Sequence, residues 1–289
     1  MTLGDVLYQI RCELAKAKID RATAEAELLL CHTLGISRTQ VYTEPERLLT
    51  NIEANRLRHV IQRRLLHEPT AYILRCCEFY GIEFYIDRRA LIPRPETELL
   101  VEEGINFALH HLACGKRLTI ADIGTGSGAI AVSLALALPK AKVYATDISA
   151  SALEVASINR QRHKVDKQIE LLQGNLLDPL PEPADMIVAN LPYVRDSELQ
   201  ALAPEIIYFE PRLAIAGGNN GWDRIRLLLD QIPGRLHPEG CLLLEIGQGQ
   251  DKTVSSMIDS HFPQAVVELV PDPSGTNRVV KIILKSECA

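Results

Sequence analysis

The chain has 289 residues, of which 47% are hydrophobic and 24% charged, and its formal net charge is −6. This is the composition of an ordinary globular protein with a sizeable core, and the length favours one large domain accompanied by a smaller one. The acidic balance excludes a protein that holds nucleic acid by phosphate neutralisation alone, so we expect no stable nucleic-acid binding.

The cysteines and the hydrophobicity profile indicate a cytoplasmic protein. The cysteine number is odd and no C-x-x-C pair occurs, so we predict neither a disulfide framework nor a metal site. No stretch approaches the roughly 18 apolar residues of a membrane span, and the first residues lack the apolar core of a signal peptide. The seven cysteines are Cys12, Cys31, Cys76, Cys77, Cys114, Cys241 and Cys288.

Residues 1–69 are predicted to form a small helical domain. Apolar residues recur at helical spacing from Leu3 to Leu14, and Asp20 is positioned to cap a second helix. Thr50 and Glu53 have the spacing of a capping box that opens a third helix. One dense basic segment is open to two interpretations, the solvated face of a helix or a docking surface for a ribosomal or RNA-binding partner: Arg56, Arg58, His59, Arg63 and Arg64.

Residues 70–92 are predicted to form a β-hairpin linker. Aromatic and β-branched residues are concentrated between Phe79 and Ile86, with Gly81 between two short runs. We expect these aromatic side chains to form the core of a hinge; the alternative is that they reach over an active site.

Residues 93–289 are predicted to form an α/β domain with a Rossmann-like, seven-stranded, mostly parallel sheet. Strands alternate with helices, which is typical of a parallel sheet covered on both faces. The last two strands are separated only by a Pro/Gly loop, so one of them is expected to run antiparallel. The expected strands are 118–122, 143–147, 169–172, 186–189, 242–245, 266–269 and 279–284.

A glycine loop follows the first expected strand. Its spacing is G-x-G-x-G over Gly124, Thr125, Gly126, Ser127 and Gly128, and not the G-x-G-x-x-G of dinucleotide sites. Such a loop brings backbone N–H groups close to a ligand. The shifted spacing favours S-adenosylmethionine, which has no pyrophosphate to seat.

Three polar side chains at strand ends complete the predicted cofactor site. Asp147 ends the second strand about 20 residues after the loop, where a carboxylate holds the two ribose hydroxyls. Asn175 is expected to bond the adenine edge while Leu176 packs on its ring. Asp122, just before the loop, is expected to face the methionine ammonium.

The fourth strand ends in a turn of sequence Asn190-Leu191-Pro192-Tyr193. The Asn190 side-chain oxygen and the Leu191 carbonyl can each accept one N–H of a planar amide, so the nitrogen can turn its lone pair towards a methyl donor. Pro192 stiffens the turn and Tyr193 offers a flat face. The turn resembles that of the amino-methyltransferases, which act on planar NH₂ groups and usually carry proline where Leu191 stands.

Further segments resemble the release-factor glutamine methyltransferase family (HemK/PrmC type) over nearly the whole chain. The segments are 91–98, 122–131, 209–214, 245–250 and 272–280, and the first, Leu-Ile-Pro-Arg-Pro-Glu-Thr-Glu, is the most specific. The resemblance implies that the protein methylates the glutamine of the Gly-Gly-Gln motif in peptide-chain release factors. It also implies that loop 124–128, Asp147 and Asn190 bind the cofactor, that residues 190–193 hold the glutamine, and that the N-terminal helices bind the release factor.

Two alternatives remain at this point. The Asn-Leu-Pro-Tyr turn also resembles that of nucleic-acid adenine N6-methyltransferases, and the same chemistry serves a glutamine methyltransferase that acts on a ribosomal protein.

Within segment 91–98, Pro93 and Pro95 favour an extended elbow between domains, and Glu96 and Glu98 favour the start of the following helix. Arg94 is expected to pair with an acidic group across the domain boundary.

Overall fold

A computed structural model describes residues 1–112 and 117–285, and the chain divides into two compact units. The helical unit contains Met1–Cys76 and Ala203–Phe209, and the sheet unit contains Cys77–Leu202 and the chain from Glu210 onward. Two of the seven cysteines, Cys114 and Cys288, lie outside the described residues. Within the described ranges no helix is long and apolar enough to cross a membrane.

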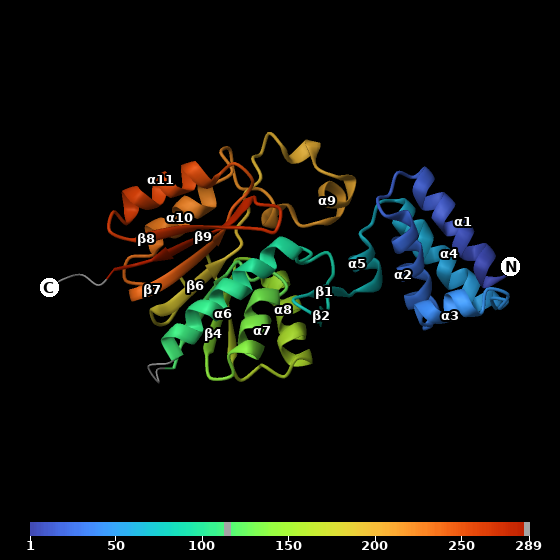
Figure 1. Cartoon of the computed structure of the whole chain (residues 1–289), viewed down its shortest axis with the longest axis horizontal. Helices are drawn as coiled ribbons and strands as arrows, with labels where there is room; N and C mark the ends of the chain where they lie inside the picture. The colour runs from blue at the N-terminus through green and yellow to red at the C-terminus, as the bar shows by residue number, and fades with distance from the viewer. Residues whose placement is uncertain (113–116, 286–289) are drawn as a thin grey trace. The chain divides into compact units, whose positions relative to one another are not determined.

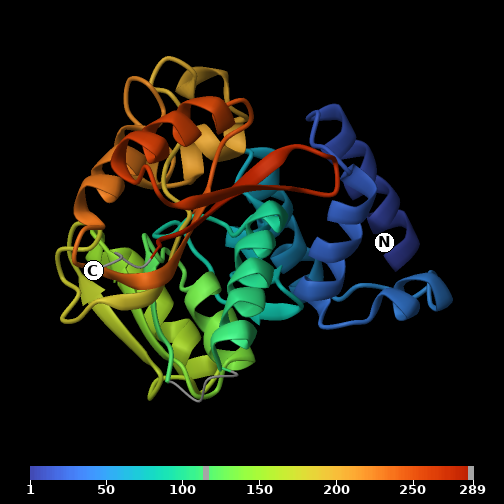
Figure 2. The same cartoon turned by 60° about the vertical axis from the view of Figure 1, so that its left-hand side comes forward.

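The helical unit is built on three longer helices that pack side by side, α1, α2 and α4 (Figures 1 and 2). Apolar residues at helical spacing, among them Leu3, Leu14, Leu29 and Ile61, form its core. The unit contains α1 (Leu3–Lys16), α2 (Ala22–Leu34), α3 (Arg38–Thr43), α4 (Asn51–Leu65), α5 (Thr70–Leu74) and α9 (Pro204–Phe209).

The helix starts in this unit follow the predicted pattern in one case and depart from it in another. Thr50 and Glu53 form the expected capping box of α4. The expected cap of α2 by Asp20 was wrong, because Arg21 occupies the cap position in a left-handed conformation without a side-chain hydrogen bond. The short helix α9 is joined to the rest of the unit by an ion pair, in which Glu205 binds the buried side chain of Arg64 at 3.2 Å.

In the sheet unit, a hairpin of β1 (Cys77–Phe79) and β2 (Ile82–Phe84) precedes a short 3-10 turn, η1 (Pro95–Thr97), and helix α6 (Glu98–Leu112). Phe79 and Phe84 meet edge to face, with ring centroids 6.2 Å apart, and are buried in the core of this unit. They therefore serve as core residues. The remaining elements are β3 (Thr119–Ile123), α7 (Ala129–Ala137), β4 (Lys142–Asp147), α8 (Ala150–Arg162), β5 (Ile169–Gln173), β6 (Ala184–Ala189), η2 (Leu199–Ala201), η3 (Arg212–Ala214), α10 (Asp223–Gln231), β7 (Leu236–Glu245), α11 (Asp251–His261), β8 (Val266–Pro271) and β9 (Asn277–Ile283).

Seven strands of the described residues form one sheet in the order β5-β4-β3-β6-β7-β9-β8. Strands β3 to β7 pair in parallel, and β9 runs antiparallel to both of its neighbours. The predicted seven-stranded, mostly parallel sheet with one antiparallel strand is confirmed. From β3 the chain first builds outward to β4 and β5 and then returns to β6 on the other side. That reversal opens a crevice at the carboxyl ends of the central strands.

The two faces of the sheet are covered by different helices, α6, α7 and α8 on one side and α10 and α11 on the other (Figure 1). Alternate strand residues point to opposite faces, so Met186 and Val188 of β6 join one apolar cluster while Ile187 and Ala189 join the other. Burial on both faces is why these strands are almost continuously apolar.

Candidate active site

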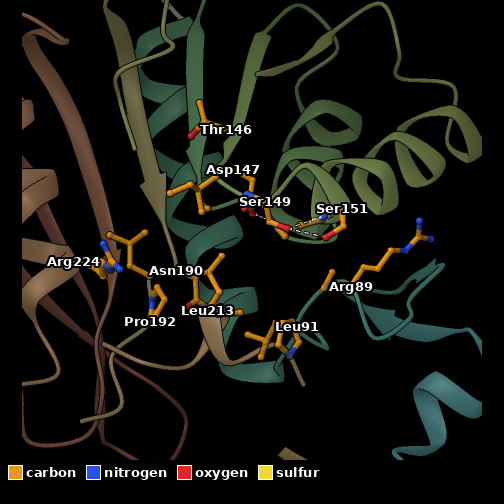
Figure 3. A pocket seen from close by; sticks show the side chains of 18 of the residues that line it. Arg89, Leu91, Thr146, Asp147, Ser149, Ser151, Asn190, Pro192, Leu213 and Arg224 are labelled. Atoms are coloured by element: carbon orange, nitrogen blue, oxygen red, sulfur yellow. Dashed lines mark hydrogen bonds between the residues drawn. The ribbon is translucent and has the colours of Figure 1, made fainter. Parts of the chain in front are cut away.

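A cavity of about 310 Å³ lies at the carboxyl ends of β3, β4 and β6, all within the sheet unit. Figure 3 shows Asp147 at the end of β4, Asn190 and Pro192 beyond the end of β6, and Leu91 and Leu213 across from Asp147. We call the side formed by residues 124–128, 147 and 174–176 the loop half, and the side formed by residues 190–193 with their supports the turn half.

The glycine loop has a backbone that other residues would strain. Gly124, Gly126 and Gly128 have φ angles of 72°, 55° and 79°. A Cβ atom at Gly128 would also lie 3.1 Å from the Cβ of Ala156 on α8. Gly124 and Gly126 line the cavity, whereas the other three loop residues do not. The glycines therefore shape the wall, and only part of the loop faces the cavity.

Asp147 provides the carboxylate of the loop half. One of its oxygens accepts a hydrogen bond from the Gly126 N–H at 2.9 Å and the other from the Ser149 N–H at 2.8 Å. Burial raises the pKa of this carboxyl, and the backbone N–H donors oppose that effect. Asp147 lines the cavity, where its carboxylate can accept a hydrogen bond from a ligand hydroxyl.

Asp122 lies beneath the loop and is fully buried. Its Oδ2 accepts hydrogen bonds from the Thr125 hydroxyl at 2.6 Å and the Ala131 N–H at 3.1 Å, whereas Oδ1 has no partner among the described residues. Burial raises its pKa to about 7. Asp122 is not among the residues that line the cavity, and its visible role is to hold the loop to the start of α7.

The remaining wall of the loop half follows β5. Gly174, Asn175 and Leu176 all line the cavity, and the Leu176 carbonyl accepts a hydrogen bond from the Thr146 hydroxyl at 3.0 Å. Ile148 lines the same wall with half of its surface exposed, and sequence analysis missed it. Its position directly after the strand-end acid was the available signal.

The turn half faces the cavity on one side and packs against Gly217 on the other. Asn190, Leu191 and Pro192 line the cavity, and Tyr193 does not. Behind the turn, Gly217 approaches so closely that a Cβ atom there would lie 2.7 Å from the Pro192 carbonyl oxygen. Burial and the nearby Glu245 raise the pKa of Tyr193 to about 12, so its hydroxyl stays protonated.

The side chain of Asn190 has a defined partner that sequence analysis did not assign. Its Nδ2 donates to the Thr97 hydroxyl at 3.0 Å, and that hydroxyl donates to Glu245 at 2.6 Å. Thr97 and Glu245 are 4% and 2% exposed. Both belong to segments whose sequence was distinctive but whose role was open.

An ion pair with a buried carboxylate supports the opposite wall. Glu210, whose side chain is 1% exposed, binds Arg94 and accepts a hydrogen bond from the Ile92 N–H. Pro211, Leu213 and Ala214, which follow Glu210, line the cavity. Both partners lie in the sheet unit, so the expected pairing of Arg94 across a domain boundary was wrong.

No group of three or more His, Cys, Asp or Glu side chains in the described part of the chain is placed to hold a metal ion. The polar side chains that line the cavity are one carboxylate, two amides, three hydroxyls and three guanidinium groups, from Asp147, Asn175, Asn190, Thr146, Ser149, Ser151, Arg88, Arg89 and Arg224. This arrangement can orient a nucleoside and grip an amide.

Family comparisons agree with the two-part organisation of the chain. The family described as "PrmC N-terminal domain" matches residues 5–74, and the family described as "Methyltransferase small domain" matches residues 99–218. The second match contains the glycine loop, Asp147 and the turn at Asn190.

Individual relatives cover almost the whole chain. A protein of Geobacter sulfurreducens named "Release factor glutamine methyltransferase" is 38% identical over 96% of this chain and 95% of its own length. A protein of the same name from Moorella thermoacetica is 39% identical over 96% of this chain and 97% of its own. Among solved structures, a methyltransferase of Pyrococcus furiosus matches with a TM-score of 0.52 and 18% identity, covering 78% of this chain and 98% of its own, which shows a shared fold.

Proposed function

This chain belongs to the release factor glutamine methyltransferase family, and we propose that it transfers a methyl group from S-adenosylmethionine to the side-chain amide nitrogen (N5) of the glutamine in the Gly-Gly-Gln motif of peptide-chain release factors. It is an enzyme with a methyltransferase domain. The proposal draws on the two halves of the cavity, which we take in turn.

The loop half fits the cofactor. The cavity that it shares with the turn half, about 310 Å³, lies at the lower end of the roughly 300–1,000 Å³ that small-molecule sites occupy. Asp147 presents its carboxylate to a ribose diol, Asn175 and Leu176 flank the place for adenine, and Gly126 allows close backbone approach. When bound, S-adenosylmethionine supplies an electrophilic sulfonium methyl. Asp122, beneath the loop, is proposed to face the methionine ammonium and to attract it by its charge.

The turn half fits a primary amide. A glutamine nitrogen is a poor nucleophile because its lone pair is delocalised into the carbonyl. Asn190 Oδ1 and the Leu191 carbonyl can each accept one N–H, which lets the nitrogen become pyramidal with its lone pair towards the methyl group. With the methyl group supplied by the bound cofactor, the amide nitrogen would carry a positive charge and would lose a proton to water.

One observation carries the proposal most directly. Because Asn190 Nδ2 is committed to the Thr97 hydroxyl, the oxygen of the same amide is directed away from Thr97. Asn190 also lines the cavity, so an acceptor and not a donor is offered to the substrate –NH₂. Tyr193 and Pro192 complete the turn, and Leu191 contributes through its main chain.

The partner is proposed to be a release factor in the cytoplasm. The helical unit, which matches the "PrmC N-terminal domain" family, is the proposed recognition domain over residues 1–69, followed by a linker over 70–92 and the catalytic domain from 93. The net charge of −6 supports a protein acceptor over a nucleic acid.

The test is methyl transfer from labelled S-adenosylmethionine to a purified release factor, with its Gly-Gly-Gln glutamine replaced by alanine as the control. Label on the wild-type factor and none on the control is expected. Label on RNA, DNA or a ribosomal protein in parallel reactions, with none on the release factor, would replace this proposal by one of the alternative acceptors.

A further inference from the structure

A buried chain of hydrogen bonds ends at Asn190. Glu245 is the last residue of β7, Thr97 is the last residue of η1, and Asn190 follows β6. The pairing of Ala189 with Leu244 places Asn190 beside Glu245 at the strand ends. Thr97 joins them, since its hydroxyl bonds both side chains.

The direction of this chain follows from the atoms available. An ionised Glu245 can only accept, so the single hydroxyl proton of Thr97 is committed to the carboxylate at 2.6 Å. The Thr97 oxygen can then only accept a hydrogen bond from Asn190. The Asn190 amide must turn its –NH₂ to Thr97, and its oxygen must face the other way.

We propose that Thr97 and Glu245 are positioning residues that fix the Asn190 amide with its oxygen towards the acceptor. The inference rests on the proposed function, in which that oxygen accepts an N–H of the substrate amide. If the Asn190 amide were rotated by 180°, its –NH₂ would meet the substrate –NH₂, donor against donor. Neither positioning residue touches the substrate, so both act through Asn190.

The cost of burying Glu245 supports a role beyond packing. Glu245 is 2% exposed, and the desolvation of its carboxyl is only partly offset by hydrogen bonds from Thr97 and Tyr193 and by the positive charge of Arg278. The negative charge of Glu96 opposes ionisation as well. Burial and Glu96 outweigh Thr97, Arg278 and Tyr193, so the pKa of Glu245 is raised to about 7. Protonated Glu245 becomes a donor, which allows the chain to reverse and the Asn190 amide to rotate.

The first test is the pair Thr97→Val and Thr97→Ser, assayed with labelled cofactor and a release factor. Valine keeps the shape and removes both hydrogen bonds, so kcat should fall on the order of tenfold to a hundredfold, with KM for the release factor and Kd for the cofactor nearly unchanged. Serine keeps the hydroxyl and should recover most of kcat. Wild-type kcat in the valine variant, or equal losses in both variants, would overturn the positioning role.

A second readout needs no turnover. In ¹⁵N-labelled protein, the Asn190 side-chain amide signal is assigned by its loss in Asn190→Ala. Its protons should exchange slowly with solvent in the wild type and in Thr97→Ser, and faster in Thr97→Val. Equal exchange in all three would contradict the proposal. If the wild type fails to methylate a release factor, the proposed function falls, and this readout still decides whether Thr97 holds Asn190.

The pH profile separates the carboxyl from the hydroxyl. At saturating cofactor, wild-type kcat should fall as the pH drops through about 7, where Glu245 gains its proton. Glu245→Gln keeps an acceptor for Thr97 and should lose this acid limb. Persistence of the limb in Glu245→Gln would overturn the role of Glu245. Folding stability changes in the opposite direction, because a raised folded-state pKa stabilises the protein as the pH falls, so the lost activity is not unfolding.

Discussion

The loop half and the turn half of the cavity are built in different ways. The loop half comes mainly from one continuous β-α-β segment, residues 119–147, in which backbone N–H groups and glycines set the geometry. The turn half combines Thr97, Asn190 and Glu245, which are far apart in the sequence and are joined by side-chain hydrogen bonds. The first half shapes the wall of a binding site through its backbone, whereas the second fixes the direction of one amide.

This difference predicts separate functional consequences. Changes in the loop half should weaken cofactor binding or folding, because its groups hold the ligand in all stages of the reaction. Changes in the turn half should lower kcat, because its acceptors matter most when the substrate nitrogen becomes pyramidal. The predictions below test that separation, beginning with the largest effect.

Asn190→Ala should give the largest effect. It removes an acceptor aimed at the reacting nitrogen, and the loss of one such group costs roughly a hundredfold to a thousandfold in kcat. Cofactor affinity, measured by calorimetry, should change by only about a few-fold, because Asp147 and the loop remain. Asn175→Ala is the matched control from the loop half and should do the reverse. Near-normal turnover by Asn190→Ala would remove the basis for the turn half as a catalytic element.

Asp147→Asn should weaken cofactor binding with little loss of kcat at saturation. The amide keeps the size of the side chain but loses the charge, and its –NH₂ becomes a donor facing the backbone N–H of either Gly126 or Ser149. Hydrogen bonds to a charged group are worth about 1.5–3 kcal/mol, so Kd should rise roughly tenfold to a hundredfold. A lower kcat at an unchanged Kd would show that Asp147 acts in the chemical step and not in cofactor binding.

Gly128→Ala should lower stability by about 1–2 kcal/mol through its left-handed backbone, and somewhat more through the contact with Ala156. Gly234→Ala provides the control, because its φ of 75° is similar and a Cβ atom there meets nothing within 4 Å. Urea unfolding of both variants separates backbone strain from contact. Equal losses would show that α8 yields to the added methyl group at no cost.

The sequence predicted the sheet, the glycine loop and the strand-end residues because each depends on local pattern. Strand periodicity and glycine spacing predict the local backbone conformation directly, and the alternation of strands with helices predicts the topology of the sheet. It did not predict that Thr97 bonds Asn190, or that Glu210 binds Arg94, because both contacts join segments more than 90 residues apart. The prediction that Asp20 caps α2 was wrong for a local reason. Arg21 occupies the cap position in a left-handed conformation, which its residue type does not predict.

Leu191→Pro should give the smallest effect on rate and therefore tests the turn half most finely. Residue 191 is proposed to act through its main-chain carbonyl, which proline retains, so kcat should change only modestly, about a few-fold. The Leu191 side chain is 4% exposed and packs in the apolar cluster on the α10 and α11 face. Its loss should cost stability on the order of 1–2 kcal/mol.

Leu191→Ala separates the two contributions of this residue, because it also shortens the side chain but leaves the backbone free. If both variants lose stability and both keep turnover, the carbonyl is the part of residue 191 that the reaction uses. If proline alone abolishes turnover, the backbone of this turn differs from that of relatives with proline at this position. The orientation of the second acceptor would then depend on leucine in this chain, as that of the first depends on Thr97.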